Sequence, residues 1–532
     1  MSPRIEARAL PTPVKVRPLE TLLAHFHDKE FIVNGFTRGF DLGFTGEPAT
    51  VTCNNSLSVN SNLALAHIKV FSEIKLGRVA GPFSHPPLKD FKCSPLSLRE
   101  KSTPGKFRLL HNLSYPYNES AVNFNIPDEA AKLKYSSIID VIDILNQYEN
   151  CFLAKCDIKE AYRLIPLSSS CYNLTGFKLG QEYFYDRCLP MGARSACKIF
   201  ERFSSSLKFI LISSFKVKFV VKMLDDFLFV GRSKYECQYA LESFQMLCRI
   251  INVPLAPEKT VGPSKCVTFL GIQLDTDTNL ASVPQDKISS YASCIKALAG
   301  KESCTLRELK SMIGKLQFAS SVVTPGRCFL RRLHDATIGA LHPNKVITIN
   351  HSMKADLNIW SSFLTSYNGK TLMSFGPPLS SIDLHLYSDA SKSGYGATYR
   401  RHFIQGLFPE SWENFDIQVL ELYPIVLLVN LFADEFKNKC ITIHCDNIAI
   451  VYALNSQTSK NKRVMQLLRP LILTLLVNNI RFQALHIPGK KNILCDKLSR
   501  QQMTPSLLKV FRMDPLPTPV PACLLPHSWD LL

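Results

Sequence analysis

The feature that most constrains this fold is a pair of adjacent carboxylates, Asp225-Asp226, between two short apolar runs. Residues 219–224 and 227–230 have the composition of β-strands, and Gly231 closes the second run. The pattern predicts a hairpin with both acids at its tip. Two unpaired charges buried between such strands would cost several kcal/mol, so the pair indicates a bound divalent cation.

A third acid fits the same prediction. Asp157 ends the apolar stretch 151–156 and opens the run Asp157-Ile158-Lys159-Glu160-Ala161-Tyr162. Three carboxylates on neighbouring strand ends can hold two Mg²⁺ ions, with Mn²⁺ as the alternative, about 3.5–4 Å apart. Polymerases use this arrangement for phosphoryl transfer.

The charge of the chain points to a polyanionic partner. Lysine and arginine total 62 against 44 acids, which gives a net charge of +18. Such an excess attracts nucleic acid first and anionic membrane second. The alternative is a soluble protein that is merely basic.

Cysteine usage and hydropathy predict the compartment. The 17 cysteines are odd in number and irregularly spaced, and none forms Cys-x-x-Cys, which disfavours a disulfide scaffold or a structural zinc site. Apolar runs such as 422–433 are too short to span a bilayer and are expected to be buried helices. The first residues lack the apolar core of a secretory signal. We therefore expect an intracellular protein, in cytoplasm or nucleus and not secreted.

A length of 532 residues predicts three or four structural units. Within the first unit, residues 35–40 are expected to form turns with aromatic anchors. Apolar spacing over residues 306–316 predicts a helix, and the basic residues Arg327, Arg331 and Arg332 follow it.

The predicted order is an extension of unassigned role at 1–80, an α+β or α/β body at 81–280, a helical part at 281–340, a connector at 341–380, a second α/β unit at 381–505 and a Pro-rich, extended or disordered tail at 506–532.

An ordered set of motifs resembles the reverse transcriptases of retroelements. The set covers about residues 80–500 and comprises Lys106-Phe107-Arg108, Asp157-x-x-x-x-Tyr162, Leu189-Pro190-Met191-Gly192, Leu224-Asp225-Asp226 and Phe269-Leu270-Gly271. The stretches 190–195 and 325–332 are most similar to the DIRS and Ngaro group of tyrosine-recombinase retrotransposons. The resemblance implies a right-hand polymerase, with fingers and palm at 81–280 and a thumb at 281–340.

The resemblance also implies roles at the metal site. Asp157, Asp225 and Asp226 would surround two metal ions, and the carbonyl of Ile158 would add a ligand. Tyr162 would be the steric gate whose ring excludes a ribose 2′-hydroxyl. The alternative for Tyr162 is an ordinary core tyrosine.

Other residues are implied to bind the incoming nucleotide. Arg108 would clamp the triphosphate, helped by Lys106 or Lys101, although a solvated basic loop is the alternative. Gly192 would let the backbone approach the templating base pair. Lys259 would protonate pyrophosphate, or be an ordinary surface lysine.

Two positions depart from the family pattern. Met223 stands where an aromatic residue is usual, and Met191 stands where many relatives carry Gln or Phe. Neither supplies a metal ligand, and methionine is a flexible apolar filler. We expect altered fidelity or rate rather than loss of chemistry.

The second α/β unit repeats the carboxylate pattern. Acids follow predicted strands at 384–388 and 441–445, a third lies near the start of a helical run at 418–436, and a fourth precedes a short helix. In chain order they are Asp389, Glu421, Asp446 and Asp496. The order resembles ribonuclease H, which implies a mixed-sheet domain, two further Mg²⁺ ions, water as the nucleophile and cleavage of RNA.

Basic residues flank this second set. Lys490 lies where many ribonucleases H carry a mobile histidine, and His486, on the predicted strand, is a weaker candidate for a proton shuttle. The run Lys460-Asn461-Lys462-Arg463 would grip the backbone of the hybrid, with a solvated helix face as the alternative.

The sequence thus predicts a retrotransposon RNA-directed DNA polymerase with ribonuclease H activity. Its partners would be RNA template, DNA primer, RNA–DNA hybrid and dNTPs, without a membrane. A decayed or domesticated module that only binds nucleic acid is the first alternative, and a host polymerase of the telomerase or group II intron type is the second. No protease or integrase signature is present, and recombinase function would come from elsewhere.

Overall fold

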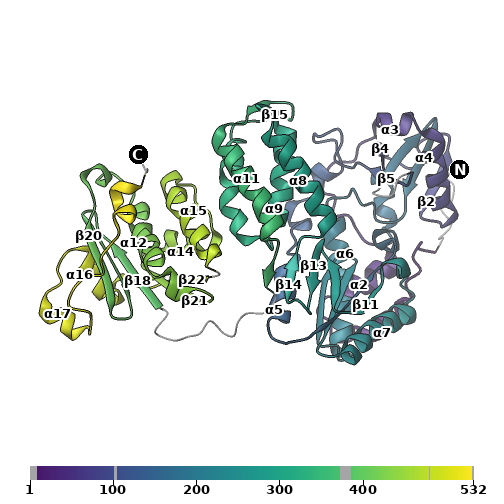
Figure 1. Cartoon of the computed structure of the whole chain (residues 1–532). Helices are drawn as coiled ribbons and strands as arrows, with labels where there is room; N and C mark the ends of the chain where they lie inside the picture. Colours follow the sequence, from purple (N-terminus) through teal and green to yellow (C-terminus); the bar gives the residue numbers. More distant parts are fainter. Residues whose placement is uncertain (1–8, 101–104, 372–384, 479, 530–532) are drawn as a thin grey trace. The chain divides into compact units, whose positions relative to one another are not determined.

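The computed structural model describes residues 9–100, 105–371, 385–478 and 480–529. The chain divides into two compact units (Figure 1). The first comprises Met1–Leu270 and Asp275–Asp277, and the second comprises Gly271–Leu274 and Thr278–Leu532. Among the helices in these described ranges, none is long and apolar enough to cross a bilayer.

The first unit is built around a four-stranded sheet with the order β11-β6-β10-β9. Its antiparallel strands are β6 (Phe152–Asp157), β9 (Phe219–Met223), β10 (Asp226–Gly231) and β11 (Val261–Ser264). The long helices α6 (Ala196–Ser213) and α7 (Lys234–Ile251) pack on it. Residues 227–231 are all buried, which explains why β10 is continuously apolar rather than alternating. The predicted hairpin is confirmed.

Two further sheets complete this unit. One has the order β1 (Val51–Thr52), β3 (Lys92–Cys93), β7 (Gly176–Leu179), β8 (Glu182–Asp186) and β2 (Val79–Phe83). The other is a two-stranded hairpin of β4 (Leu96–Glu100) and β5 (Phe107–His111). Helices α3 (Leu57–Asn60) and α4 (Leu63–Lys75) contribute to the small core between them.

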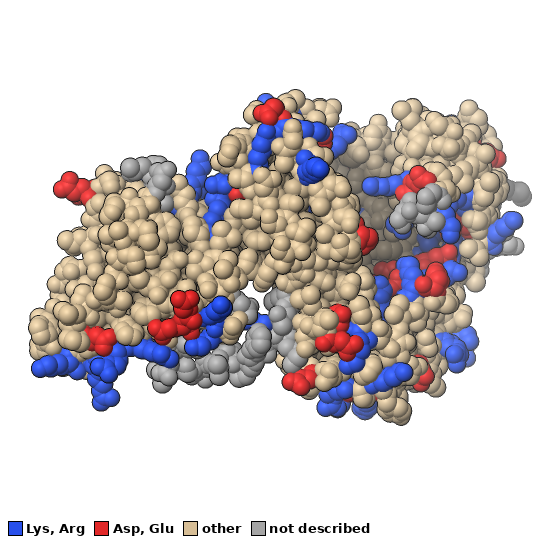
Figure 2. Space-filling view, in the orientation of Figure 1, with Lys and Arg blue, Asp and Glu red and all other residues tan. Residues whose placement is uncertain are grey.

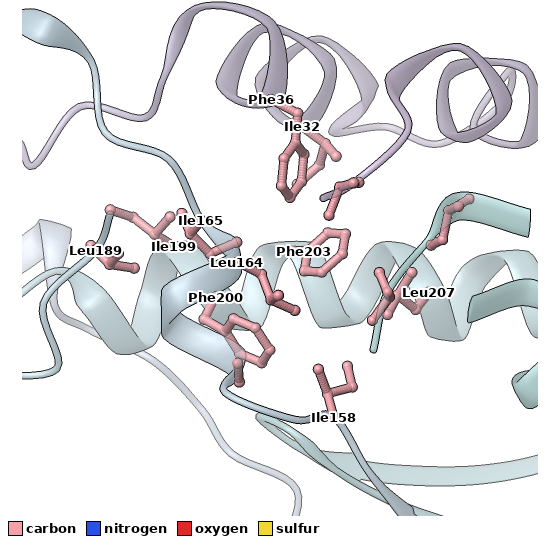
Figure 3. Packing of buried hydrophobic residues seen from close by; sticks show 14 of the residues in the cluster. Ile32, Phe36, Ile158, Leu164, Ile165, Leu189, Ile199, Phe200, Phe203 and Leu207 are labelled. Atoms are coloured by element: carbon pink, nitrogen blue, oxygen red, sulfur yellow. The ribbon is translucent and has the colours of Figure 1, made fainter. Parts of the chain in front are cut away.

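The N-terminal residues are part of the main core of this unit. Helices α1 (Val16–Leu22) and α2 (Lys29–Arg38) contact α7 and α6 respectively. Figure 3 shows Ile32 and Phe36 of α2 directed toward Phe203 of α6, and the rings of Phe36 and Phe203 lie 4.9 Å apart between centroids. The turns predicted from residue 35 are wrong as far as Arg38, because these residues continue α2.

The second unit begins with a helical group. Helices α8 (Gln285–Ala299), α9 (Leu306–Ala319) and α11 (His351–Ser366) lie side by side in Figure 1, joined by the short segments η6 (Thr324–Phe329) and α10 (Arg331–Asp335). A capping box between Thr305 and Glu308 starts α9, which confirms the helix predicted at 306–316. The predicted connector therefore contains a helix, α11, that packs against α8.

A five-stranded mixed sheet follows, with the order β20-β19-β18-β21-β22. Strands β18 (His385–Ala390), β21 (Cys440–Cys445) and β22 (Arg481–His486) are parallel, whereas β19 (Gly394–Tyr399) and β20 (His402–Leu407) are antiparallel additions. The helices of this domain are α12 (Ile417–Leu431), α13 (Ala433–Phe436), α14 (Ile448–Ser456), α15 (Lys462–Val477) and α16 (Ile493–Ser499). Buried α12 confirms that the apolar run from residue 422 is a core helix.

The C-terminal tail packs along the edge of this sheet. It contains α17 (Pro505–Val510) and the short turns η10 (Ala522–Leu524) and η11 (Pro526–Ser528). The Thr518 amide donates to the Phe403 carbonyl of edge strand β20 at 2.8 Å, and Tyr423 Oη donates to the Leu524 carbonyl at 2.8 Å. The disordered alternative is wrong as far as residue 529, because the tail covers an otherwise open strand edge, whereas residues 513–521 have no helix or strand and fit the extended alternative.

Candidate active sites

The first three acids meet at one end of the β6–β10 pair. Asp226 lies directly opposite Asp157 in the strand register, and the Ile158 amide donates to the Asp225 carbonyl at 3.0 Å. Asp225 itself lies in the turn between β9 and β10. The structure therefore brings together the three carboxylates that the sequence predicted.

The hairpin turn is held by a carboxylate beneath it. Leu224 has a positive φ of 54°, a costly conformation for a leucine, and its amide donates to Glu201 Oε2 of α6 at 3.2 Å. Lys222 of β9 is buried and pairs with Glu201, and its ammonium also donates to Ser204 Oγ at 2.9 Å. Sequence reasoning missed this support, although a lysine within an apolar strand is a usable signal.

Two lysines compensate part of the negative charge. Lys155 Nζ lies 3.3 Å from Asp226 Oδ2 and 3.8 Å from Asp157 Oδ1. Lys259 Nζ donates to Asp157 Oδ2 at 2.5 Å. The sequence predicted a role for Lys259 but not for Lys155, which lies two residues before Asp157 and therefore faces the same side of the strand.

The remaining carboxylate oxygens fit a divalent cation. Asp157 Oδ1 and Asp226 Oδ1 are buried without a hydrogen-bond partner among the described residues. Burial raises the pKa of Asp226 to about 7; Lys155 opposes this shift, whereas repulsion by Asp157 adds to it. Burial also raises the pKa of Asp225. A cation that bound these oxygens would replace the missing partners and favour the ionised carboxylates.

Tyr162 lies close to this site. It belongs to the 3₁₀ turn η3 (Ala161–Leu164), it is half-buried, and its ring packs 5.4 Å from the Phe200 ring between centroids. Its hydroxyl lies 3.2 Å from Cys197 Sγ, and burial raises its pKa. Tyr162 thus has the ring contact expected of a core tyrosine, and it is also partly exposed.

The predicted triphosphate ligands lie on a separate element. Lys106 is exposed directly before strand β5, and exposed Arg108 of β5 is opposite Arg99 of β4. Lys101 lies outside the described residues. The hairpin therefore presents several cations to solvent.

Gly192 is explained by a contact within the protein. A Cβ atom at this position would lie 1.9 Å from the His111 carbonyl oxygen of β5. The Gly192 carbonyl accepts a hydrogen bond from Asn123 Nδ2 at 2.8 Å. The structure thus requires glycine here for packing against β5, a reason different from the predicted approach to a base pair.

The second set of acids also converges. Asp389 lies on β18, Glu421 on α12, Asp446 directly after β21, and Asp496 on α16. The sequence placed Asp496 before a helix, but the residue lies inside α16. Ser499 Oγ of the same helix donates to Asp389 Oδ2 at 2.5 Å. Gly396 allows this helix to lie close to β19, since a Cβ atom there would lie 2.3 Å from Leu498 Cβ.

Burial and mutual repulsion dominate the electrostatics of this set. Burial, followed by repulsion from Asp389 and Asp446, raises the pKa of Glu421 to about 9. Burial raises the pKa of Asp389 to about 6; the Ser499 hydrogen bond opposes the shift, and Asp446 and Asp496 add to it. The pKa of Asp446 is also raised, first by burial. All four carboxylates therefore interact electrostatically.

The donor set suits a hard cation. Possible ligand atoms of Glu421, Cys445 and Asp446 lie within 4.8 Å of one another, and Glu421 Oε2 is buried without a hydrogen-bond partner among the described residues. Burial raises the pKa of the Cys445 thiol, and carboxylate oxygens are the ligands that a hard cation prefers.

Further residues support the loops around this set. Arg500 Nε donates to Asp496 Oδ1 at 2.8 Å, and Asn492 Nδ2 donates to the Ser388 carbonyl at 2.8 Å. His486 Nε2 lies 3.1 Å from the Asp446 carbonyl oxygen, and Lys490 lies in the turn η9 (Gly489–Lys491). Ser499, Arg500 and Asn492 were not predicted, because polar residues near a helix end have no distinctive spacing.

Comparison with known proteins supports this reading of the sequence. Residues 100–274 match the family model described as reverse transcriptase (RNA-dependent DNA polymerase). An enzymatic polyprotein of Cassava vein mosaic virus is 22% identical over 379 residues, which cover 66% of this chain and 52% of that protein. The Gag-Pro-Pol polyprotein of Human T-cell leukemia virus 3 (strain 2026ND) is 25% identical over 204 residues, which cover 37% of this chain and 13% of that protein. The chain thus spans about half or less of these relatives.

Solved structures of similar fold include a foamy viral protease-reverse transcriptase in complex with double-stranded DNA. One such structure has a TM-score of 0.51 at 15% identity and covers 90% of this chain and 83% of that chain. Another has a TM-score of 0.50 at 14% identity and covers 90% and 99%. The predicted fold class, a right-hand polymerase of mixed α and β structure followed by a ribonuclease H-like domain, is confirmed.

The matched residues 100–274 contain β6, the β9–β10 hairpin and all three acids of the first set. The relatives found by sequence are viral polyproteins. The segment that matches the reverse transcriptase family thus contains the first set of acids, in a chain that is similar to viral polyproteins.

Proposed function

We propose that the protein is an RNA-directed DNA polymerase with ribonuclease H activity. The observation that carries the proposal is the convergence of Asp157, Asp225 and Asp226 at one end of a β-sheet, within the segment that matches the reverse transcriptase family. The second set of acids, which comes from strand ends and helices of the mixed-sheet domain, supports the ribonuclease H activity. The substrates would be an RNA template with a DNA primer, an RNA–DNA hybrid and dNTPs.

At the first site, Asp157, Asp225 and Asp226 would hold Mg²⁺ or Mn²⁺, with the Ile158 carbonyl as a further ligand. Bound divalent cations would lower the pKa of the primer 3′-hydroxyl and neutralise charge on the leaving group. Lys259, which pairs with Asp157, would donate a proton to pyrophosphate. Glu201 fixes the turn that carries Asp225.

Tyr162, Arg108 and Lys106 would act on the incoming nucleotide. Tyr162 would exclude a 2′-hydroxyl by its ring, and Arg108 with Lys106 would bind the triphosphate. Gly192 would shape the neighbouring loop through its contact with His111.

At the second site, Asp389, Glu421, Asp446 and Asp496 would bind divalent cations of the same kind. Ser499 orients Asp389, and Arg500 orients Asp496. The reaction would cut the RNA strand of a hybrid beside its 2′-hydroxyls, with water as the nucleophile.

Two finer assignments are also proposals. The stretches 190–195 and 325–332 favour an origin in a retrotransposon of the DIRS and Ngaro group. All 17 cysteines are free thiols, most of them buried, which supports an intracellular location in cytoplasm or nucleus.

The deciding experiment is primer extension on poly(rA) annealed to oligo(dT) with Mg²⁺. We expect extension by the wild type and its loss in Asp225→Asn, because the variant removes one metal-binding oxygen and keeps the size of the side chain. Circular dichroism and binding of the same primer–template would show that both proteins are folded.

A failure of the wild type is equally informative. A folded wild type that binds the primer–template without extending it would contradict the proposal and favour the decayed binding module. In that case Met223→Tyr and Met191→Gln would be tested first.

A further inference from the structure

A basic pocket lies in the second unit, and no acid of either set lines it. The cavity has a volume of about 730 Å³ and opens between α10 and the N-terminal half of α15. Its walls carry six cationic side chains and one carboxylate, Asp335, which pairs with Arg331. The cations are Arg331, Arg332, Lys460, Lys462, Arg463 and Arg469. Figure 2 shows Lys and Arg side chains gathered next to α15.

A buried aspartate positions two of these arginines. The Asp356 side chain is 1% exposed and accepts a hydrogen bond from Arg332 Nη1 at 2.8 Å. Arg469 Nη2 lies 3.6 Å from the other Asp356 oxygen. One negative charge therefore faces two guanidinium groups, and the wall of the pocket keeps an excess of positive charge.

Arg469 has hydrogen-bonding capacity that the protein leaves unused. Its side chain is only 11% exposed, and its Nε and Nη2 atoms are buried without a hydrogen-bond partner among the described residues. The Nε atom of Arg331 is in the same state. Buried N–H groups without partners are rare in proteins, so these guanidinium groups can take a further acceptor.

We propose that the basic pocket is a binding site for phosphate groups. Guanidinium forks match phosphate oxygens in pairs, and exposed Lys460 and Lys462 add point charges at the rim. The volume admits more than one phosphate, as in a polyphosphate or two successive nucleotides. The ligand is thus either a free polyphosphate or the backbone of a nucleic-acid strand. The site does not depend on the proposed activities, and only the nucleic-acid source is linked to them.

The first test titrates the full-length protein with tripolyphosphate by calorimetry at low salt. We compare the wild type with Lys460→Gln/Lys462→Gln and with Arg469→Gln. The control is Lys437→Gln/Lys439→Gln, which removes two exposed lysines of the same domain outside the pocket. For a free polyphosphate we expect saturable binding that falls at least about tenfold in both pocket variants and stays unchanged in the control.

The second test measures binding of an RNA–DNA hybrid as a function of salt. For a free polyphosphate alone, hybrid affinity stays unchanged in the pocket variants, whereas for a nucleic-acid backbone hybrid affinity falls in them. The slope of log K against log salt then becomes smaller in magnitude by about 1–2, since each lost phosphate contact contributes about 0.7–0.9. Asp225→Asn keeps this behaviour, so a failure of the proposed polymerase activity would not obscure the result.

One pattern overturns the proposal. If both ligands bind the lysine variant, the control and the wild type equally, the basic pocket is not a phosphate site. Thermal unfolding of Arg469→Gln shows whether this variant is folded. If it is not, the exposed lysine pair decides the question alone.

Discussion

The two sets of acids differ in how their charge is compensated. In the first, Lys155 and Lys259 contact Asp226 and Asp157, and the pKa of Asp226 is raised to about 7. In the second, the pKa of Glu421 is raised to about 9. Among the described residues, Arg500, which pairs with Asp496, is the only cationic side chain that forms an ion pair with the second set.

This difference has a physical consequence for assembly. Lys155, two residues before Asp157 on β6, and Lys259, on the turn Pro257–Lys259, compensate the charge of the first set before any cation binds. Glu421 is instead kept neutral by burial, so the second set needs a cation or a proton to offset its repulsion. We therefore expect the second set to respond more strongly to pH and to metal.

The largest expected effect separates the two sets. Asp225→Asn should reduce primer extension more than about 100-fold and leave hybrid cleavage unchanged, and Asp446→Asn should do the reverse. Loss of an outer partner of a metal site typically costs 10–100-fold, and loss of a direct ligand costs more. Parallel assays on labelled hybrid and primer–template measure both activities. Equal loss of both activities in either variant would contradict two independent sites.

Removing a lysine should shift the pH profile of the first set. Lys155 lowers the pKa of Asp226, so Lys155→Gln should raise it above about 7. Less of the ionised carboxylate is then present on the acid side, and the acidic limb of primer extension should move up by about one pH unit. Extension at pH 6.5 and limiting Mg²⁺ should fall about tenfold, equivalent to about 1.4 kcal/mol. Lys155→Arg keeps the charge, so the acidic limb of its pH profile should lie at the same pH as that of the wild type. An unmoved limb in Lys155→Gln would show that the lysine does not act on Asp226.

A smaller effect is expected at the serine that orients Asp389. Ser499→Ala removes the hydrogen bond that lowers the pKa of Asp389, so this pKa should rise above about 6. Hybrid cleavage at pH 7 should fall about threefold to tenfold, in line with a hydrogen bond to a charged group. Ser506→Ala, an exposed serine of α17, is the matched control. Unchanged cleavage across pH 6–8 would mean that Asp389 needs no such partner.

The smallest effect is on stability without metal. Glu421 has an ordinary pKa of 4.5 that is raised to about 9 in the folded chain. The folded state therefore binds more protons between these values, and the free energy of unfolding decreases as pH rises through this window. Glu421→Gln removes this pH-dependent decrease in the free energy of unfolding. At pH 8 with EDTA, its Tm should therefore exceed that of the wild type by about 2–4 °C for each 1 kcal/mol by which the free energy of unfolding is larger.

Mg²⁺ and a surface variant complete this experiment. Added Mg²⁺ should raise the Tm of the wild type more than that of Glu421→Gln, because the cation favours the ionised carboxylate. Glu413→Gln, on an exposed turn, should leave the Tm unchanged. A Tm of Glu421→Gln below that of the wild type at pH 8 would show that the glutamate is compensated in some other way.

Much of the site could be predicted from local pattern. Acids next to apolar runs identified strand ends, and the ordered motifs identified which acids belong together. Two predictions of the same kind failed, the second of them in part. Residues 35–38 continue a helix because Phe36 packs on Phe203, and the tail is ordered because it meets the edge of β20. In both cases a distant partner decided the local structure.

The sequence by itself determined the two sets of carboxylates and the strands and helices that carry them, since apolar runs and charged termini are local properties. Only the tertiary structure decided which distant side chains support the first set and which ones form the basic pocket. Lys222 and Glu201 are 21 residues apart, and Asp356 joins Arg332 to Arg469, which lies over 100 residues further along the chain. Such pairs leave no periodic trace in the sequence, because they depend on how packed elements bring separate segments within a few ångströms.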